Sequence, residues 1–137
     1  MTDRSDTERF IGSWRLVRTT NDGAVIPERG ARPAGIITYD ASGWMTAQIQ
    51  PDRPPVAMAG DKPTGEEALA ALNGYTAYFG PFSVDDVKKI VTHHREGSVQ
   101  PGWERMKDFV RAYEFSGKQL ILRPVGTTSE VVWERMS

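Results

Sequence analysis

The sequence predicts a mainly β protein: a closed, antiparallel, up-and-down barrel of about eight strands. Short runs of alternating apolar and polar residues recur between turn signals along the 137-residue chain, and their connectors are of hairpin length. No long helical pattern separates consecutive strands, so neighbours in sequence are expected to pair directly. Closing the sheet removes its unpaired edges, which favours a barrel formed by a single domain over residues 1–137.

Two short helical segments are expected from capping signatures. Near the N-terminus, Ser5 is followed three residues later by Glu8, which predicts a turn or two of helix. Thr64 opens a second signature of the same kind, and an apolar stripe follows it. We therefore expect one short helix over residues 65–73.

The strands are expected between these helices and after them. Their predicted ranges are 14–19, 35–39, 44–49, 75–84, 89–98, 105–115, 119–123 and 129–136. Residues 51–65 are rich in Pro and Gly and predict a loop. Long loops in compact domains are often functional, so the segment from Pro51 to Pro63 is expected to form a lid over one barrel mouth, with the 65–73 helix plugging or flanking it. Val56 and Met58 are expected to offer an apolar surface toward a ligand.

Composition excludes several classes of protein. The chain has no Cys, which excludes disulfides, a thiol nucleophile and a thiolate zinc site. Its 17 Lys and Arg balance 18 Asp and Glu, so neither nucleic acid nor an anionic membrane surface is an expected partner. The N-terminus is polar and no apolar stretch approaches about 18 residues, which predicts a cytoplasmic protein without a signal peptide. We expect a monomer or a homodimer. No cofactor motif is present.

Charge suggests which side chains of the 89–98 strand face the barrel interior. Lys89 and Arg95 are expected to face water, which places His94 and Glu96 inside. His93 and His94 are adjacent and point to opposite faces, so they cannot both reach one metal ion, and no metal site is expected. His94 is the one candidate for a general base, with Glu96 on its face.

The following strand carries its bulky side chains on one face. Phe109, Tyr113 and Phe115 alternate with polar residues and cannot all be turned to solvent. The alternation takes Arg111 inside with them. A guanidinium group in a small barrel requires acceptors for its hydrogen bonds.

Two interpretations of this inward polar group remain open. Arg111 and Glu96 could form a structural ion pair or lie in water at the barrel mouth. Alternatively, Arg111 and His94 could form the polar end of an apolar ligand pocket. Tyr39 and Tyr78 suit either a packed core or the wall of such a pocket.

Residues 10–17, which contain a Gly-x-Trp motif, resemble the opening of the lipocalin-like domain family, small calycin-type barrels of bacteria and fungi. Four further segments resemble the family's successive blocks in the same order: residues 35–43, 74–80, 91–98 and 133–135. The resemblance implies a lipocalin-like barrel, and it implies that Arg135 packs across Trp14 in a structural cation–π contact.

Three functions are compatible with this fold. The leading hypothesis is binding of a small, mainly apolar molecule that carries an acidic or carbonyl group. The first alternative is an isomerase or cyclase acting on an apolar, natural-product-like substrate, with His94 moving a proton. The second is a non-catalytic interaction module whose barrel is filled by its own side chains. A cavity above about 300 Å³ favours the first two.

Overall fold

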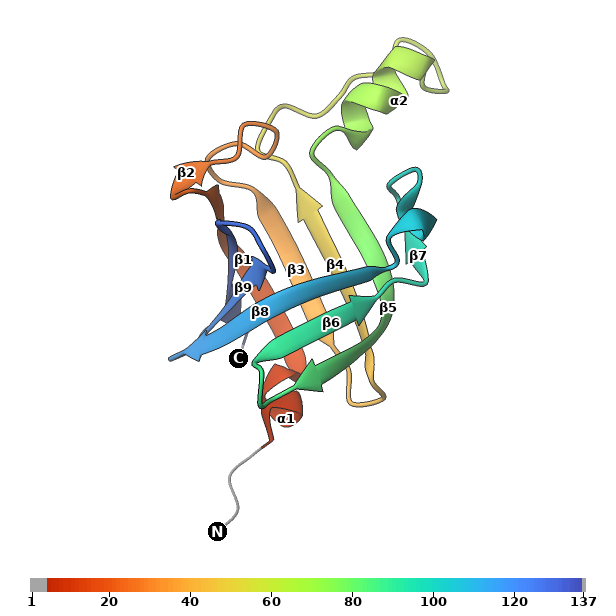
Figure 1. The fold of residues 1–137 in the computed structure, drawn as a ribbon. Coiled ribbons are helices and arrows are strands. Elements are labelled where there is room, and N and C mark those ends of the chain that lie inside the picture. The colour runs from red at the N-terminus through yellow and green to blue at the C-terminus, as the bar shows by residue number, and fades with distance from the viewer. Residues whose placement is uncertain (1–4, 137) are drawn as a thin grey trace.

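The computed structural model describes residues 5–136, which form ten strands, two α-helices and one 3₁₀ turn (Figure 1). The elements in chain order are α1 (Asp6–Phe10), β1 (Gly12–Asn21), β2 (Ala24–Val25), β3 (Ala34–Tyr39), β4 (Trp44–Gln50), α2 (Gly65–Leu72), β5 (Thr76–Asp85), β6 (Ile90–His94), β7 (Gly97–Ser98), the 3₁₀ turn (Trp103–Arg105), β8 (Asp108–Ser116), β9 (Gln119–Pro124) and β10 (Ser129–Arg135).

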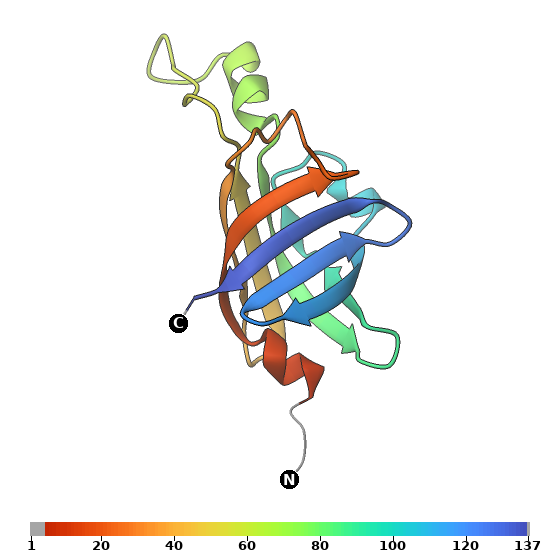
Figure 2. The same ribbon diagram turned by 90° about the vertical axis from the view of Figure 1, so that its left-hand side faces the viewer.

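The strands form one closed antiparallel barrel. Along the sheet the order is β10-β9-β8-β6-β5-β4-β3-β1, and β10 also pairs with β1, so the eight long strands close on themselves (Figures 1 and 2). The two-residue strands β2 and β7 are additions to β1 and β5. The predicted fold class is therefore confirmed. No helix within residues 5–136 has the length and apolar character needed to cross a membrane.

The seam between β1 and β10 contains a bulge that interrupts the alternation of inward and outward side chains along β1. The register shifts between Leu16 and Arg18, and beyond the shift Thr19 is buried while Arg18 is exposed. An extra residue in one strand reverses the faces that follow it. Trp14 and Leu16 therefore face the core, whereas Arg18, which simple alternation would place beside them, does not.

Helix α1 closes one end of the barrel (Figure 1). Its last residue, Phe10, is fully buried and meets Tyr39, Tyr113 and Phe115 edge to face, with ring centroids 4.9–5.0 Å apart. Such pairs add to the free energy gained from burial. This aromatic plug seals the closed end.

The Gly-x-Trp motif completes the same end of the barrel. The Trp14 ring is 2% exposed, and its Nε1 donates to the carbonyl oxygen of Phe10 at 2.9 Å. The guanidinium carbon of Arg135 lies 4.1 Å from the Trp14 ring centroid, which confirms the predicted contact. Gly12 is required here because its φ is +130° and a Cβ there would lie 2.7 Å from Nη1 of Arg135.

Helix α2 extends beyond the barrel rather than plugging it (Figures 1 and 2). The capping box of Thr64 and Glu67 forms as predicted. Arg53 ties the preceding loop to the end of the helix by donating to the carbonyl oxygen of Ala71 at 2.9 Å. Met58 is 52% exposed and lines an apolar groove between this loop and α2 rather than the barrel cavity.

Candidate functional site

The barrel encloses a cavity of about 280 Å³, which we call the barrel cavity. Its lining consists of Arg29, Ile37, Ala47, Ile49, Thr76, Tyr78, Arg95, Ser98, Gln100, Phe109, Arg111, Leu122, Val131 and Trp133. The volume is slightly below the roughly 300 Å³ typical of the smallest ligand pockets, but the interior is not packed solid. The aliphatic members and Trp133 come from the inward faces of β3, β4, β9 and β10, and Phe109 comes from β8.

Three arginines line this cavity, and none of the lining residues is Asp or Glu. Arg29 comes from the turn after β2, Arg95 follows β6, and Arg111 lies in β8. The ion pairs formed by residues 5–136 involve none of the three. Nor do the described residues bring together a group of His, Asp and Glu that could hold a metal ion. The cavity is thus cationic.

Arg95 is held by neutral partners. It is 6% exposed, its guanidinium carbon lies 3.7 Å from the Phe109 ring centroid, and Nη2 donates to the carbonyl oxygens of Met106 and Trp103. Its Nε is buried and has no hydrogen-bond partner within the described residues. Burial lowers the pKa of Arg95, yet a guanidinium remains protonated in proteins, so the charge persists.

Arg111 and Arg29 have more hydrogen-bonding capacity to spare. Arg111 lies 4.4 Å from the Phe109 ring centroid and makes one long bond, 3.5 Å, to the carbonyl oxygen of Val110. Arg29 donates to Thr76 Oγ1 at 3.0 Å. Burial lowers the pKa of both groups, and for Arg29 the positive charge of Arg111 adds to the effect. Each guanidinium offers five N–H donors, so most of them remain available to a ligand.

A buried hydrogen-bonded row lies behind one wall of the cavity. His93 is 1% exposed, its Nε2 lies 2.7 Å from Tyr39 Oη, and its Nδ1 lies 2.8 Å from Tyr78 Oη. Burial lowers the pKa of His93 to about 3, which keeps the imidazole neutral at pH 7. Of these three residues, Tyr78 lines the cavity.

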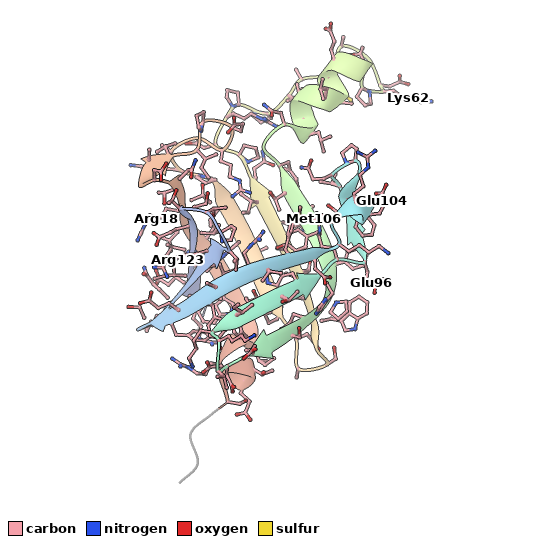
Figure 3. The ribbon with its side chains drawn as sticks, in the orientation of Figure 1. Arg18, Lys62, Glu96, Glu104, Met106 and Arg123 are labelled. Atoms are coloured by element: carbon pink, nitrogen blue, oxygen red, sulfur yellow. The ribbon has the colours of Figure 1, made fainter. Side chains whose placement is uncertain are left out.

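The predicted faces of β6 are reversed. Val91, His93 and Arg95 point inward, whereas His94 lies on the outside of the barrel. Glu96 also lies on the outside, as Figure 3 shows. Lys89 misled the prediction because it precedes β6, in a turn with φ of +56°, so its exposure says nothing about the strand. Arg95 misled the prediction because its guanidinium group points inward and stacks on Phe109 instead of facing water.

The location of His94 removes it as a proton carrier inside the barrel. On the outer face its Nε2 lies 2.9 Å from Ser83 Oγ and its Nδ1 lies 3.0 Å from Asp108 Oδ1. This order of groups is that of a serine hydrolase triad. None of the three lines the barrel cavity, however, so a substrate held there cannot reach them. The predicted contact of Arg111 with His94 or Glu96 is likewise wrong.

The remaining predicted site residues divide into two groups. Phe109, Arg111 and Tyr78 line the cavity. Tyr113 points inward but donates to Asp6 Oδ2 at 2.6 Å at the closed end, and Tyr39 contacts His93 instead of the cavity.

Sequence reasoning missed three residues of this region, namely Arg29, Arg95 and His93. The charged run at 85–89 was a usable signal, because it is typical of a longer turn and would have removed Lys89 from the strand. No local pattern marks Arg29, which reaches the cavity from a connecting segment.

Comparisons with known proteins agree on the fold. A family model described as a lipocalin-like domain matches residues 11–136. No curated protein matches the chain.

Solved structures resemble the chain at low identity. A DUF4847 family protein from Bacteroides vulgatus has 14% identity and a TM-score of 0.53, with 97% of this chain and 100% of that chain covered. An uncharacterised protein from Bacteroides eggerthii has 9% identity and a TM-score of 0.55, with 93% and 99% covered. Fatty-acid-binding protein 1 of Echinococcus granulosus has 10% identity and a TM-score of 0.46, with 95% and 99% covered.

Proposed function

This chain belongs to the lipocalin-like domain family, and we propose that its barrel binds a small amphipathic anion. The anionic group, of the carboxylate class, lies among the arginines, and the apolar body packs against the aliphatic and aromatic lining. The observation that carries this proposal is a cavity lined by three arginines and by no Asp or Glu.

Taking a charge out of water costs free energy unless an opposite charge replaces the lost hydration. Arg95 is buried and Arg29 and Arg111 are half-buried, and no Asp or Glu lines the cavity beside them. Placing an anion among Arg29, Arg95 and Arg111 offsets that cost through charge-assisted hydrogen bonds, which are about twice as strong as neutral ones. A ligand with a single carboxylate can accept from two of these groups at once.

Cavity size limits the ligand. A volume of about 280 Å³ equals that of roughly nine water molecules in the liquid, which corresponds to a ligand of about nine or ten non-hydrogen atoms. Octanoate, an eight-carbon carboxylate, fits this range. Octan-1-ol has the same chain and no charge, so the two compounds separate recognition of the anion from burial of the tail.

The test is calorimetric titration of both compounds at pH 7. We expect octanoate to bind at least about tenfold more tightly than octan-1-ol, because only the carboxylate engages the arginines. Arg111→Met should remove that preference. Arg18→Met removes the same charge from the exposed side of β1 and serves as the control, with affinities unchanged. Equal affinities for the two compounds in the wild-type protein, or binding of neither, would contradict the proposal.

A further inference from the structure

We propose that Tyr39 and His93 act as positioning residues that direct the hydroxyl proton of Tyr78 into the barrel cavity. Tyr78 then donates a hydrogen bond to whatever anion the cavity holds. The direction in which hydrogen bonds are donated along the row Tyr39–His93–Tyr78 follows from the free protein alone. The effect of this direction on a ligand rests on the proposed function.

The row begins at Tyr39, which fixes its direction. Tyr39 is 1% exposed, and within residues 5–136 its hydroxyl has one hydrogen-bond partner, Nε2 of His93. Burial raises the pKa of this phenol well above its ordinary value, so the proton stays on the oxygen. A buried O–H that donates to nothing is costly. Tyr39 therefore donates, and Nε2 of His93 accepts.

His93 transmits this direction to the other side of its ring. A neutral imidazole carries one N–H and one acceptor nitrogen, and burial keeps His93 neutral. Because Nε2 accepts from Tyr39, the ring proton is on Nδ1. Nδ1 lies 2.8 Å from Tyr78 Oη, so His93 donates to Tyr78.

Tyr78 must then direct its own proton elsewhere. Its hydroxyl has no other hydrogen-bond partner among the described residues, and its side chain lines the barrel cavity. Burial raises the pKa of Tyr78 to about 12, so the hydroxyl remains a donor near neutral pH. Each bond in the row polarises the next, which strengthens the final donor. The cavity thus offers an anion a neutral phenol O–H as well as the guanidinium groups.

The reverse direction is disfavoured by the same contacts. With the proton on Nε2, His93 would donate to Tyr39, whose own proton would then lack an acceptor in the core. Tyr78 would donate to Nδ1 and present only oxygen lone pairs to the cavity. Such a lining would repel a carboxylate at this point, so the tautomer of His93 decides what Tyr78 can bind.

The direct test measures that tautomer in the ligand-free protein. Long-range proton–nitrogen NMR correlations of ¹⁵N-labelled protein distinguish a protonated ring nitrogen from a bare one. The chain has two His, and a His94→Gln variant identifies the signals of His93. We expect a protonated Nδ1 and a bare Nε2. A proton on Nε2, or on both nitrogens at pH 7, would overturn the inference whatever the protein binds.

A second experiment tests the consequence for binding. Tyr78→Phe should weaken octanoate about tenfold, because it removes a hydrogen bond to a charged group. Tyr39→Phe leaves the cavity lining intact but releases His93, and we expect octanoate to weaken about threefold or more, with little change for octan-1-ol. Tyr113→Phe, which removes a hydroxyl that contacts Asp6, is the matched control and should leave both affinities unchanged.

The outcomes separate the two proposals. Wild-type affinity in Tyr39→Phe, alongside weakened binding in Tyr78→Phe, would show that Tyr39 and His93 do not position the donor. Failure of the wild-type protein to bind octanoate would overturn the proposed function, and the NMR measurement would still decide the direction of the row.

Discussion

At the closed end of the barrel a buried carboxylate has three partners, whereas the barrel cavity is lined by three guanidinium groups and no carboxylate. Asp6 accepts from Tyr113 Oη at 2.6 Å and from Lys89 Nζ at 2.7 Å, and Arg9 lies 3.5 Å away. The difference indicates which charges serve the fold and which await a ligand. A charge matched within the protein stabilises it, while unmatched charges around a cavity favour a partner of opposite sign.

The largest effect on stability is expected from a substitution that disrupts the closed end. Trp14→Ala should lower the free energy of unfolding by about 3–5 kcal/mol, because it leaves a hole in the core and removes the hydrogen bond to Phe10. Urea denaturation followed by circular dichroism measures this change. A loss below about 1 kcal/mol would mean that the closed end contributes little to stability.

Replacing the matched carboxylate should have an intermediate effect with a defined pH dependence. Asp6→Asn should cost about 1–3 kcal/mol at pH 7, because Lys89 loses its acceptor charge. Hydrogen bonds from Lys89 and then Tyr113 lower the pKa of Asp6 in the folded protein. Its contribution is therefore complete above the unfolded pKa of about 3.9 and is lost as pH falls through the folded pKa.

Denaturation of both proteins between pH 7 and pH 2 tests this dependence. The difference between wild type and Asp6→Asn should be constant from pH 7 to about pH 5 and should shrink in acid. A difference that persists unchanged at pH 2 would assign the role of Asp6 to shape rather than charge.

A smaller effect is expected at the seam between β1 and β10. Arg135→Lys should lower stability by about 0.5–1 kcal/mol, because an ammonium lacks the planar face that stacks on Trp14 and cannot reproduce the bond to the carbonyl oxygen of Ile11. Thermal unfolding of wild type and variant measures this loss of stability. An unchanged melting temperature would contradict a stabilising role for this stack.

The smallest effect on stability is expected in the cavity, and it gives the sharpest contrast with Asp6. Arg111→Met should leave the ligand-free protein within about 1 kcal/mol of wild type, since replacing an unmatched buried charge is often neutral or stabilising. With octanoate at about 100 times its Kd, wild type should gain about 2.7 kcal/mol and the variant much less. A variant that loses several kcal/mol without ligand would show that Arg111 serves the fold.

Predictions from sequence succeeded where the determinants are local. The capping box of Thr64 and Glu67 lies within one turn of helix, and each hairpin is set by its own turn residues. Inward placement of Arg111 was correct because Phe109, Tyr113 and Phe115 share its face, and three bulky aromatic side chains leave little choice. The contact of Arg135 with Trp14 came from the family resemblance.

The faces of β6 and the position of Arg29 could not be obtained in this way. Alternation shows that His93 and His94 lie on opposite faces, but not which face is inside. That choice depends on whether Arg95 meets an aromatic ring, and the ring is supplied by Phe109 of β8.

The sequence by itself determined a lipocalin-like barrel whose strands alternate apolar and polar residues. It also determined the Gly-x-Trp motif at the closed end and an inward arginine on β8. Only the tertiary structure decided that Arg29, Arg95 and Arg111 surround one cavity without a carboxylate and that a buried histidine joins Tyr39 to Tyr78. The physical reason is the distance along the chain over which each kind of interaction acts. Hydrogen-bonded turns and strand alternation act over a few residues, whereas the balance of buried charge is set by side chains brought together when the barrel closes.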